Sequence, residues 1–107
     1  MRRGLPLAVA LGAALAAPAF SAPAPKVHVV EMRKMAFGPT PKGLKAGDVI
    51  EWVNADIFRH TATARDKSFN VDLAPKKRAR TVLKKAGVVA FYCKFHPGMT
   101  GTLQIAR

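Results

Sequence analysis

Three residue types that bind soft metals recur at intervals of three near the C-terminus: Cys93, His96 and Met99. Residues three apart on a strand point to opposite faces, so these side chains converge only if the chain leaves the strand and wraps around a point. Pro97 and Gly98 make such a turn plausible. Thiolate, imidazole and thioether together favour copper over magnesium, calcium or manganese.

One further imidazole would complete a trigonal site of two histidines and a cysteine with a weak axial methionine. His60 is the candidate, because it follows a predicted strand ending at Asn54 and lies in a short segment that carries hydrophobic residues. Zinc is the competing metal, but it prefers more cysteine or histidine and has little use for a thioether. The residues therefore predict one copper ion, Cu(I)/Cu(II), with the ligands His60, Cys93, His96 and Met99.

Cys93 is the single cysteine of the chain, so it has no partner for an intramolecular disulfide. A lone cysteine can be a buried bystander, a reactive thiol, an intermolecular cross-link or a metal ligand. Cys93 ends an apolar run and shares a strand face with Val89 and Phe91, so we expect it to point between two sheets. A bound metal would also help to stabilise so small a fold.

The N-terminal segment has the pattern of an export signal. Arg2 and Arg3 precede an apolar run over residues 5–17, and the small residues Ala19 and Ser21 stand where a signal peptidase reads the chain. The run is shorter than the roughly 20 apolar residues that a membrane span needs.

We therefore predict a cleaved signal peptide over residues 1–21 and a mature domain over residues 22–107, periplasmic or otherwise exported. Cleavage after Ala19 or Ala22 and an uncleaved anchor are the alternatives. Once the signal is cleaved, no segment remains that predicts stable membrane insertion.

The chain is strongly basic, with 18 Lys and Arg against 6 Asp and Glu and a formal net charge of +12 among its 107 residues. Such a charge suits a nucleic acid, a membrane surface or an acidic protein as partner. Export, the lack of a recognisable binding motif and the dispersal of Lys and Arg across turns argue against nucleic acid.

Short runs of alternating or β-branched residues, separated by turn residues, predict strands rather than helices. Together they indicate one all-β domain, a small antiparallel Greek-key β-sandwich. The clearest runs cover residues 27–32, 49–54, 68–73, 80–83, 88–93 and 102–106.

The first of these runs and the residues just after it give expected positions for His28, Met32 and Met35. Val27 and Val29 are the expected core positions, so His28, which alternates with them, is expected on the surface. Met32 and Met35 are expected to fill gaps in the core, with assistance to Cu(I) as a minority alternative.

At this point the sequence resembles the cupredoxins, the small type I blue copper proteins, and within them the amicyanin, pseudoazurin and plastocyanin group. The resemblance covers nearly all of the mature chain, from residues 35–39 through residues 45–54 and His60 to residues 93–103. It implies that His60 and the Cys-x₂-His pair are equatorial ligands and that the following methionine is axial. The family often has Asn after the first histidine, where it ties two loops together; here Thr61 takes that place.

The resemblance implies a one-electron carrier rather than an enzyme, and no acid–base or nucleophile–base pair suggests catalysis. Electrons are expected to pass through the exposed edge of His96, with Phe95, Pro97 and Gly98 as neighbours. Lys94 and the basic residues 76–78 would steer an acidic redox protein toward it.

The expected partner of this monomer is a c-type cytochrome, a dehydrogenase, or a copper reductase or oxidase. The alternative function is a copper-binding module for storage, delivery or tolerance, whose ligands would be the same.

Overall fold

The computed structural model describes residues 4–6, 12 and 24–107. The predicted signal peptide, residues 1–21, lies almost wholly outside the described residues. Within the described part, no helix is long and apolar enough to cross a membrane.

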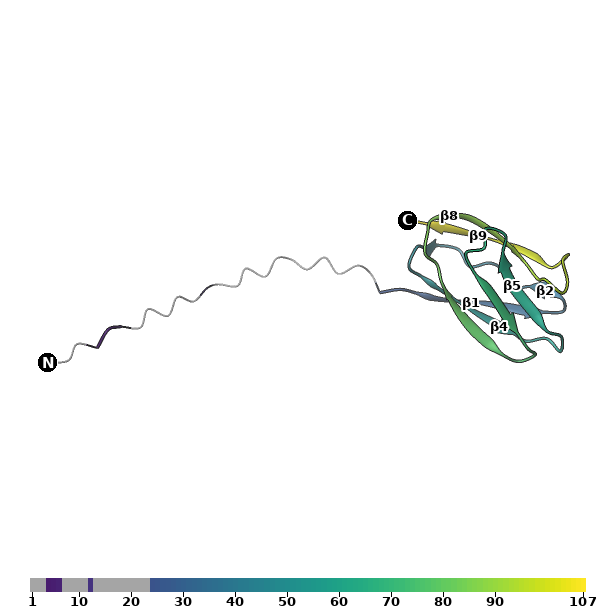
Figure 1. Ribbon diagram of the computed structural model, residues 1–107, viewed down its shortest axis with the longest axis horizontal. Coiled ribbons are helices and arrows are strands. Elements are labelled where there is room, and N and C mark those ends of the chain that lie inside the picture. The colour runs from purple at the N-terminus through teal and green to yellow at the C-terminus, as the bar shows by residue number, and fades with distance from the viewer. Residues whose placement is uncertain (1–3, 7–11, 13–23) are drawn as a thin grey trace.

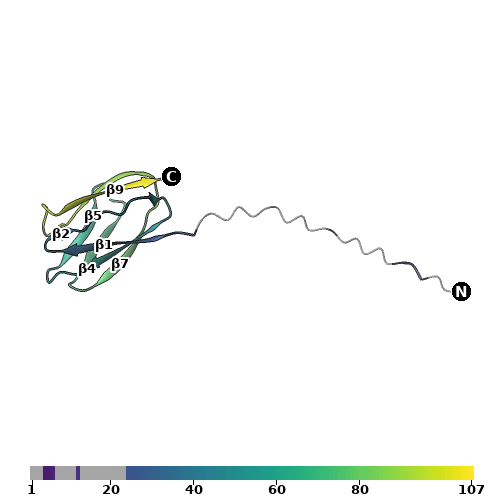
Figure 2. The ribbon, with the colours of Figure 1, turned by 180° about the vertical axis from the view of Figure 1, so that it is seen from behind.

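Residues 24–107 fold into two packed β-sheets, seen from opposite sides in Figures 1 and 2. The described strands are β1 (Val27–Arg33), β2 (Ala36–Phe37), β3 (Leu44–Lys45), β4 (Val49–Asn54), β5 (His60–Ala64), β6 (Asn70–Leu73), β7 (Arg78–Val82), β8 (Gly87–Tyr92) and β9 (Thr100–Ala106).

One sheet has the strand order β2-β1-β4-β7 and the other the order β3-β9-β8-β5-β6. The predicted all-β sandwich is therefore confirmed. Most neighbouring strands are antiparallel, but β1 pairs with β4 and β3 pairs with β9 in parallel. The sheets are thus mixed, a difference from the antiparallel arrangement that the sequence predicted.

Aromatic side chains fill the centre of the space between the sheets. The ring centroid of Phe91 lies 5.2 Å from that of Trp52 and 4.7 Å from that of Phe37. Trp52 also donates its indole N–H to the Thr81 hydroxyl at 3.0 Å, which satisfies its buried polar atom. Cys93 follows Phe91 on the same face and is completely buried, as predicted from the alternation.

The predicted faces of β1 are wrong. Val27 and Val29 are 46% and 50% exposed, whereas Val30 and Met32 belong to the core. The parallel register with β4 explains this reversal, because Val30 pairs with the buried Trp52. The two exposed valines belong to the outer face of the sheet.

His28 consequently faces inward and only 16% of its side chain is exposed, so the expected surface position is also wrong. Its Nε2 lies 3.0 Å from Oδ2 of Asp48, which is itself buried. The same carboxylate accepts the amide N–H groups of Lys26 and Lys45, each at 3.1 Å. Asp48 therefore joins the start of β1 to the turn between β3 and β4.

We expect Asp48→Asn to lower the free energy of unfolding at neutral pH. Hydrogen bonds from the Lys26 amide and then the His28 ring hold the pKa of Asp48 below its ordinary value of 3.8. A carboxyl with a lowered folded pKa adds stability above its unfolded pKa, and this stability disappears as the pH falls through the folded pKa. Urea unfolding at neutral pH and at acid pH, well below the ordinary carboxyl value of 3.8, should show the difference in stability between wild type and variant shrinking as the pH falls. An equal difference at both pH values would contradict the assignment.

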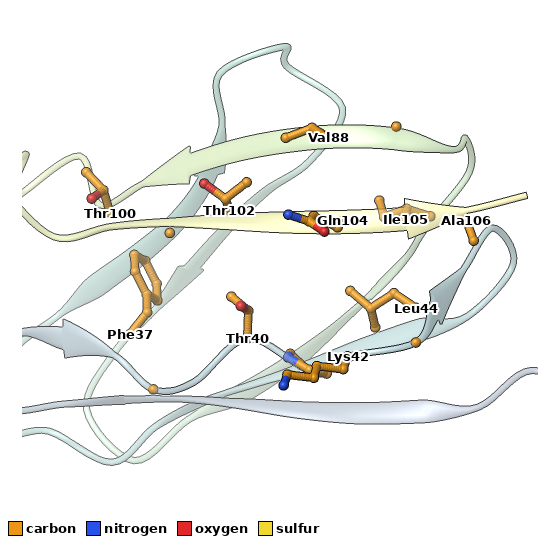
Figure 3. Close-up of a pocket in the computed structure, with 15 residues that line it drawn as sticks. Phe37, Thr40, Lys42, Leu44, Val88, Thr100, Thr102, Gln104, Ile105 and Ala106 are labelled. Atoms are coloured by element: carbon orange, nitrogen blue, oxygen red, sulfur yellow. The ribbon is translucent and has the colours of Figure 1, made fainter.

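A groove of about 870 Å³ runs along the side of β9, where β3 covers only Ile105 and Ala106 of that strand. Figure 3 shows Thr102 and Gln104 on one side of it and Thr40 and Lys42 on the other. The predicted metal ligands do not line this groove, so it is separate from the site described next.

Candidate metal centre

The predicted ligands come together at one end of the sandwich. His60 begins β5 and Cys93 follows the end of β8. The last residues of these antiparallel strands pair, Thr63 with Tyr92 and Ala64 with Phe91, so the start of β5 extends past the end of β8, toward the segment that begins with Cys93. His96 and Met99 belong to the connection between β8 and β9.

Cys93 and His60 form the buried pair at the centre of this end. The Sγ atom of Cys93 lies 3.8 Å from Nδ1 of His60, and both side chains are completely buried. The ring centroid of His96 lies 5.1 Å from that of His60. Among the described residues, cysteine, histidine, aspartate and glutamate side chains form no ready-made group of three metal ligands. The close, buried pair of Cys93 and His60 therefore defines the centre of the candidate site.

Two backbone hydrogen bonds close the connection that carries the other predicted ligands. Cys93 donates its N–H to the Met99 carbonyl at 3.0 Å, and Met99 donates its N–H to the His96 carbonyl at 2.8 Å. Met99 is buried, while His96 is partly exposed. The turn predicted from Pro97 and Gly98 thus brings three residues of one short segment to the same end of the fold.

Thr61 links the two segments that carry the buried pair. Its amide N–H donates to Sγ of Cys93 at 3.3 Å, and its hydroxyl accepts the amide N–H of Lys94 at 2.9 Å. The side chain at this position therefore does tie the segments together, although it is not the asparagine common in the resembling family.

Asp56 contacts the outer edge of the His60 ring and was not identified from the sequence. Its Oδ2 lies 2.9 Å from Nε2 of His60 and accepts the Met35 amide N–H at 3.0 Å. The hydrogen bond from His60, which has the largest effect, and the one from the Met35 amide lower the pKa of Asp56 to about 2. The available sequence signal was a carboxylate four residues before the candidate histidine.

Asn54, the last residue of β4, organises the loop that leads to His60. Its side-chain amide donates to the carbonyls of Phe58, at 2.7 Å, and Leu73, at 3.0 Å. Its side-chain oxygen accepts the Asp56 N–H at 2.9 Å. This buried residue therefore satisfies the polar backbone around it and orders the loop.

Three exposed hydrophobic residues belong to the two segments that carry His60 and His96. The exposed fractions are 73% for Ile57, 48% for Phe58 and 52% for Phe95. The Phe58 ring meets the His96 ring edge to face, with centroids 6.2 Å apart. We call Ile57, Phe58 and Phe95 the apolar patch; only Phe95 was expected from the sequence, because the other two come from the loop before β5.

Met32 and Met35 have different positions. Met32 is completely buried in the core, as expected. Met35 is 39% exposed, so its predicted core position is wrong. It lies in the turn between β1 and β2 with a φ of 61°, which directs its amide toward Asp56 rather than its side chain into the core.

The donor set is chemically suited to copper. A thiolate about 2.3 Å and an imidazole nitrogen about 2.0 Å from one metal ion would lie about 3.7 Å apart at an angle of about 120°. The observed distance between Sγ of Cys93 and Nδ1 of His60 is 3.8 Å. The two atoms are therefore spaced for one shared metal ion.

The chain resembles curated copper proteins in sequence. It is 32% identical over 90 residues to the plastocyanin of Nostoc punctiforme, covering 66% of this chain and 65% of that protein. It is 28% identical over 79 residues to the amicyanin of Paracoccus versutus, covering 68% and 60%. The chain thus spans somewhat less than two thirds of the length of each relative. No family model matches the sequence.

The fold is shared with a solved structure of a reduced amicyanin variant, with a TM-score of 0.66 and 19% identity. The likeness covers 81% of this chain and 87% of that one. It includes the two-sheet sandwich described above. The chain therefore has the cupredoxin fold and is similar in sequence to two blue copper proteins, a plastocyanin and an amicyanin.

Proposed function

We propose that the chain would hold one copper ion with His60, Cys93, His96 and Met99, and that it carries single electrons between redox partners. The observation that carries the proposal is the buried approach of Sγ of Cys93 to Nδ1 of His60. When bound, copper would supply the one-electron Cu(I)/Cu(II) couple. The protein would act in the periplasm or another exported compartment, as its N-terminal sequence predicts.

The residues around the site would keep its geometry fixed during electron transfer. Thr61 holds both Sγ of Cys93 and the Lys94 amide, and the Met99 backbone closes the ligand segment on itself. Groups that are fixed in advance need little rearrangement when the charge at the site changes. The buried thiolate also favours retention of the metal over its release, which supports electron transfer over copper storage, delivery or tolerance.

His96 would be the route by which electrons enter and leave. It is the partly exposed member of the proposed ligand set, and the apolar patch around it excludes water from a docked partner. The proposed role is that of a carrier rather than an enzyme, with a single redox site and this patch as its docking surface.

The test of this proposal is the colour of the purified protein. With Cu(II) it should be intensely blue because of charge transfer from the Cys93 thiolate, and ascorbate should bleach it reversibly. One equivalent of copper should remain bound through repeated cycles, as expected of a carrier. A colourless protein with copper in ordinary tetragonal geometry would overturn the proposed type I site. Copper loss on each reduction would favour delivery instead.

The proposed partner is an acidic redox protein, namely a c-type cytochrome, a dehydrogenase, or a copper reductase or oxidase. Lysines stand next to the segments that carry the apolar patch: Lys94 precedes Phe95, and Lys76 donates to the carbonyl of Ala55, two residues before Ile57, at 2.8 Å. A cationic rim around an apolar centre attracts an acidic surface and sets its orientation. The chain would act as a monomer, without nucleic acid.

Lys94→Glu is expected to slow electron transfer to an acidic partner more than Lys26→Glu. Lys94 adjoins the proposed site, whereas Lys26 lies just before β1, and both are exposed. The wild-type rate should fall steeply with salt, because the Debye length shortens from about 30 Å at 0.01 M to about 10 Å at 0.1 M. Stopped-flow kinetics over a salt series measures this, and equal rates for all three proteins would contradict electrostatic steering.

A further inference from the structure

Asp56 lies behind the His60 ring, on the edge opposite to Cys93. Its Oδ2 is 2.9 Å from Nε2, while Nδ1 of the same ring is 3.8 Å from Sγ of Cys93. A carboxylate at this distance accepts a hydrogen from Nε2. The hydrogen of a neutral ring then resides on Nε2, and the lone pair of Nδ1 is directed toward Cys93.

The carboxylate is itself held by neighbouring backbone groups. Its Oδ2 accepts the Met35 N–H at 3.0 Å from the turn between β1 and β2, and its Oδ1 accepts the Ile57 N–H at 2.9 Å. The Asp56 N–H in turn donates to Asn54 at 2.9 Å. Only 12% of the Asp56 side chain is exposed, so the negative charge has a fixed place beside the ring.

We propose that Asp56 is a positioning residue of the copper centre, which fixes the tautomer of His60 and favours the more highly charged Cu(II) over Cu(I). The inference rests on the proposed function and extends it to a residue outside the four proposed ligands. A fixed carboxylate bonded to a ligand imidazole increases the electron density on the metal-binding nitrogen. Its negative charge also stabilises the ion with the larger positive charge.

The test compares Asp56→Ala and Asp56→Asn with the matched control Asp72→Asn. Asp72 pairs with Thr61 across the strands, next to His60, but it is exposed and bonds to Arg59 at 2.7 Å. The control therefore removes one negative charge from the same neighbourhood without touching the His60 ring. If Asp56→Ala folds poorly, Asp56→Asn, which keeps the size of the side chain, supplies the comparison.

Asp56→Ala is expected to weaken Cu(II) affinity by about 10- to 100-fold in competition with a chelator. Both Asp56 variants should raise the reduction potential, and a tenfold loss of preference for Cu(II) corresponds to about 59 mV for one electron. Asp72→Asn should change the affinity and the potential much less. Equal shifts in the Asp56 variants and the control would overturn the proposal, because a general charge effect would then explain them.

Nitrogen NMR of the copper-free protein at about pH 8 tests the positioning independently of copper. Wild-type His60 should carry its hydrogen on Nε2, and Asp56→Ala should produce a mixture of the two tautomers. Hydrogen on Nδ1 in the wild type would overturn the proposal. The wild-type protein could show the Nε2 tautomer and yet never turn blue with Cu(II). That result would contradict the proposed function, whereas the positioning of the His60 ring by Asp56 would still stand.

Discussion

Cys93→Ser is expected to abolish the blue absorption completely, at any concentration of added Cu(II). The hydroxyl of serine is a hard and weakly acidic donor, so it neither replaces a thiolate ligand nor supplies its charge-transfer band. Serine is close to cysteine in size, and the site is completely buried, so the fold should persist. Visible absorption of the copper-loaded protein measures the loss, and near-ultraviolet circular dichroism of Trp52 reports the packing of the core.

The matched control is Met32→Leu, which replaces a buried sulfur-containing side chain that is not a proposed ligand. Its volume changes little, so the cost in stability should stay below about 1.5 kcal/mol and the colour should remain. Full blue colour in Cys93→Ser, or loss of colour in Met32→Leu with an intact fold, would show that the proposed ligand set is wrong.

Gly101→Ala is expected to destabilise the protein by about 1–3 kcal/mol or more, through overpacking of the core. A Cβ atom on Gly101 would overlap Cζ of Phe91 and lie 2.7 Å from its Cε2, and the Phe91 side chain is completely buried. That ring cannot easily move away, because Phe37 and Trp52 pack against it. With a total stability of about 5–15 kcal/mol for a typical domain, urea unfolding of the copper-free protein should show a clearly lower midpoint.

Gly98→Ala is the control, because a Cβ there has no heavy atom within 4 Å among the described residues and the backbone requires no positive φ. Its stability should match the wild type. Phe91→Leu should cost less in the Gly101→Ala background than alone, since the smaller side chain relieves the contact. Additive effects of these two substitutions would contradict the clash.

Strands with one clearly apolar face could be predicted from the sequence. In β4, Ile50 and Trp52 face the core, and in β8, Val89 and Phe91 do. That alternation also gave the inward direction of Cys93, and the turn residues after it predicted that the ligand segment would fold back. These features depend on a few neighbouring residues, so a single sequence contains them.

The faces of β1 could not be predicted in this way. Val27, Val29 and Val30 are all apolar, so the alternation does not distinguish the inner face from the outer. The choice is made by the parallel register with β4, a partner about twenty residues away in the sequence. The alternation of apolar and polar residues within β1 does not show that its partner strand runs parallel to it.

The environment of His60 depends on how one loop folds. Asn54 and Asp56 are polar residues after a strand, a pattern that fits an ordinary turn equally well. Their importance becomes clear once the loop bends back, so that Asn54 binds the Phe58 carbonyl and Asp56 meets the His60 ring. Ile57 and Phe58 join the apolar patch for the same reason.

Because β9 is the last strand in the chain and pairs within its sheet, the candidate metal centre is completed late in folding. β9 lies between β3 and β8, and it pairs with β8 from Thr100 to Ile105. A chain is made from its N-terminus, so this strand is made after every other strand described. The segment from Cys93 to Met99 is held at both ends only when β9 has paired. A metal held by the proposed ligands His60, Cys93, His96 and Met99 would therefore bind after β9 has paired with β8.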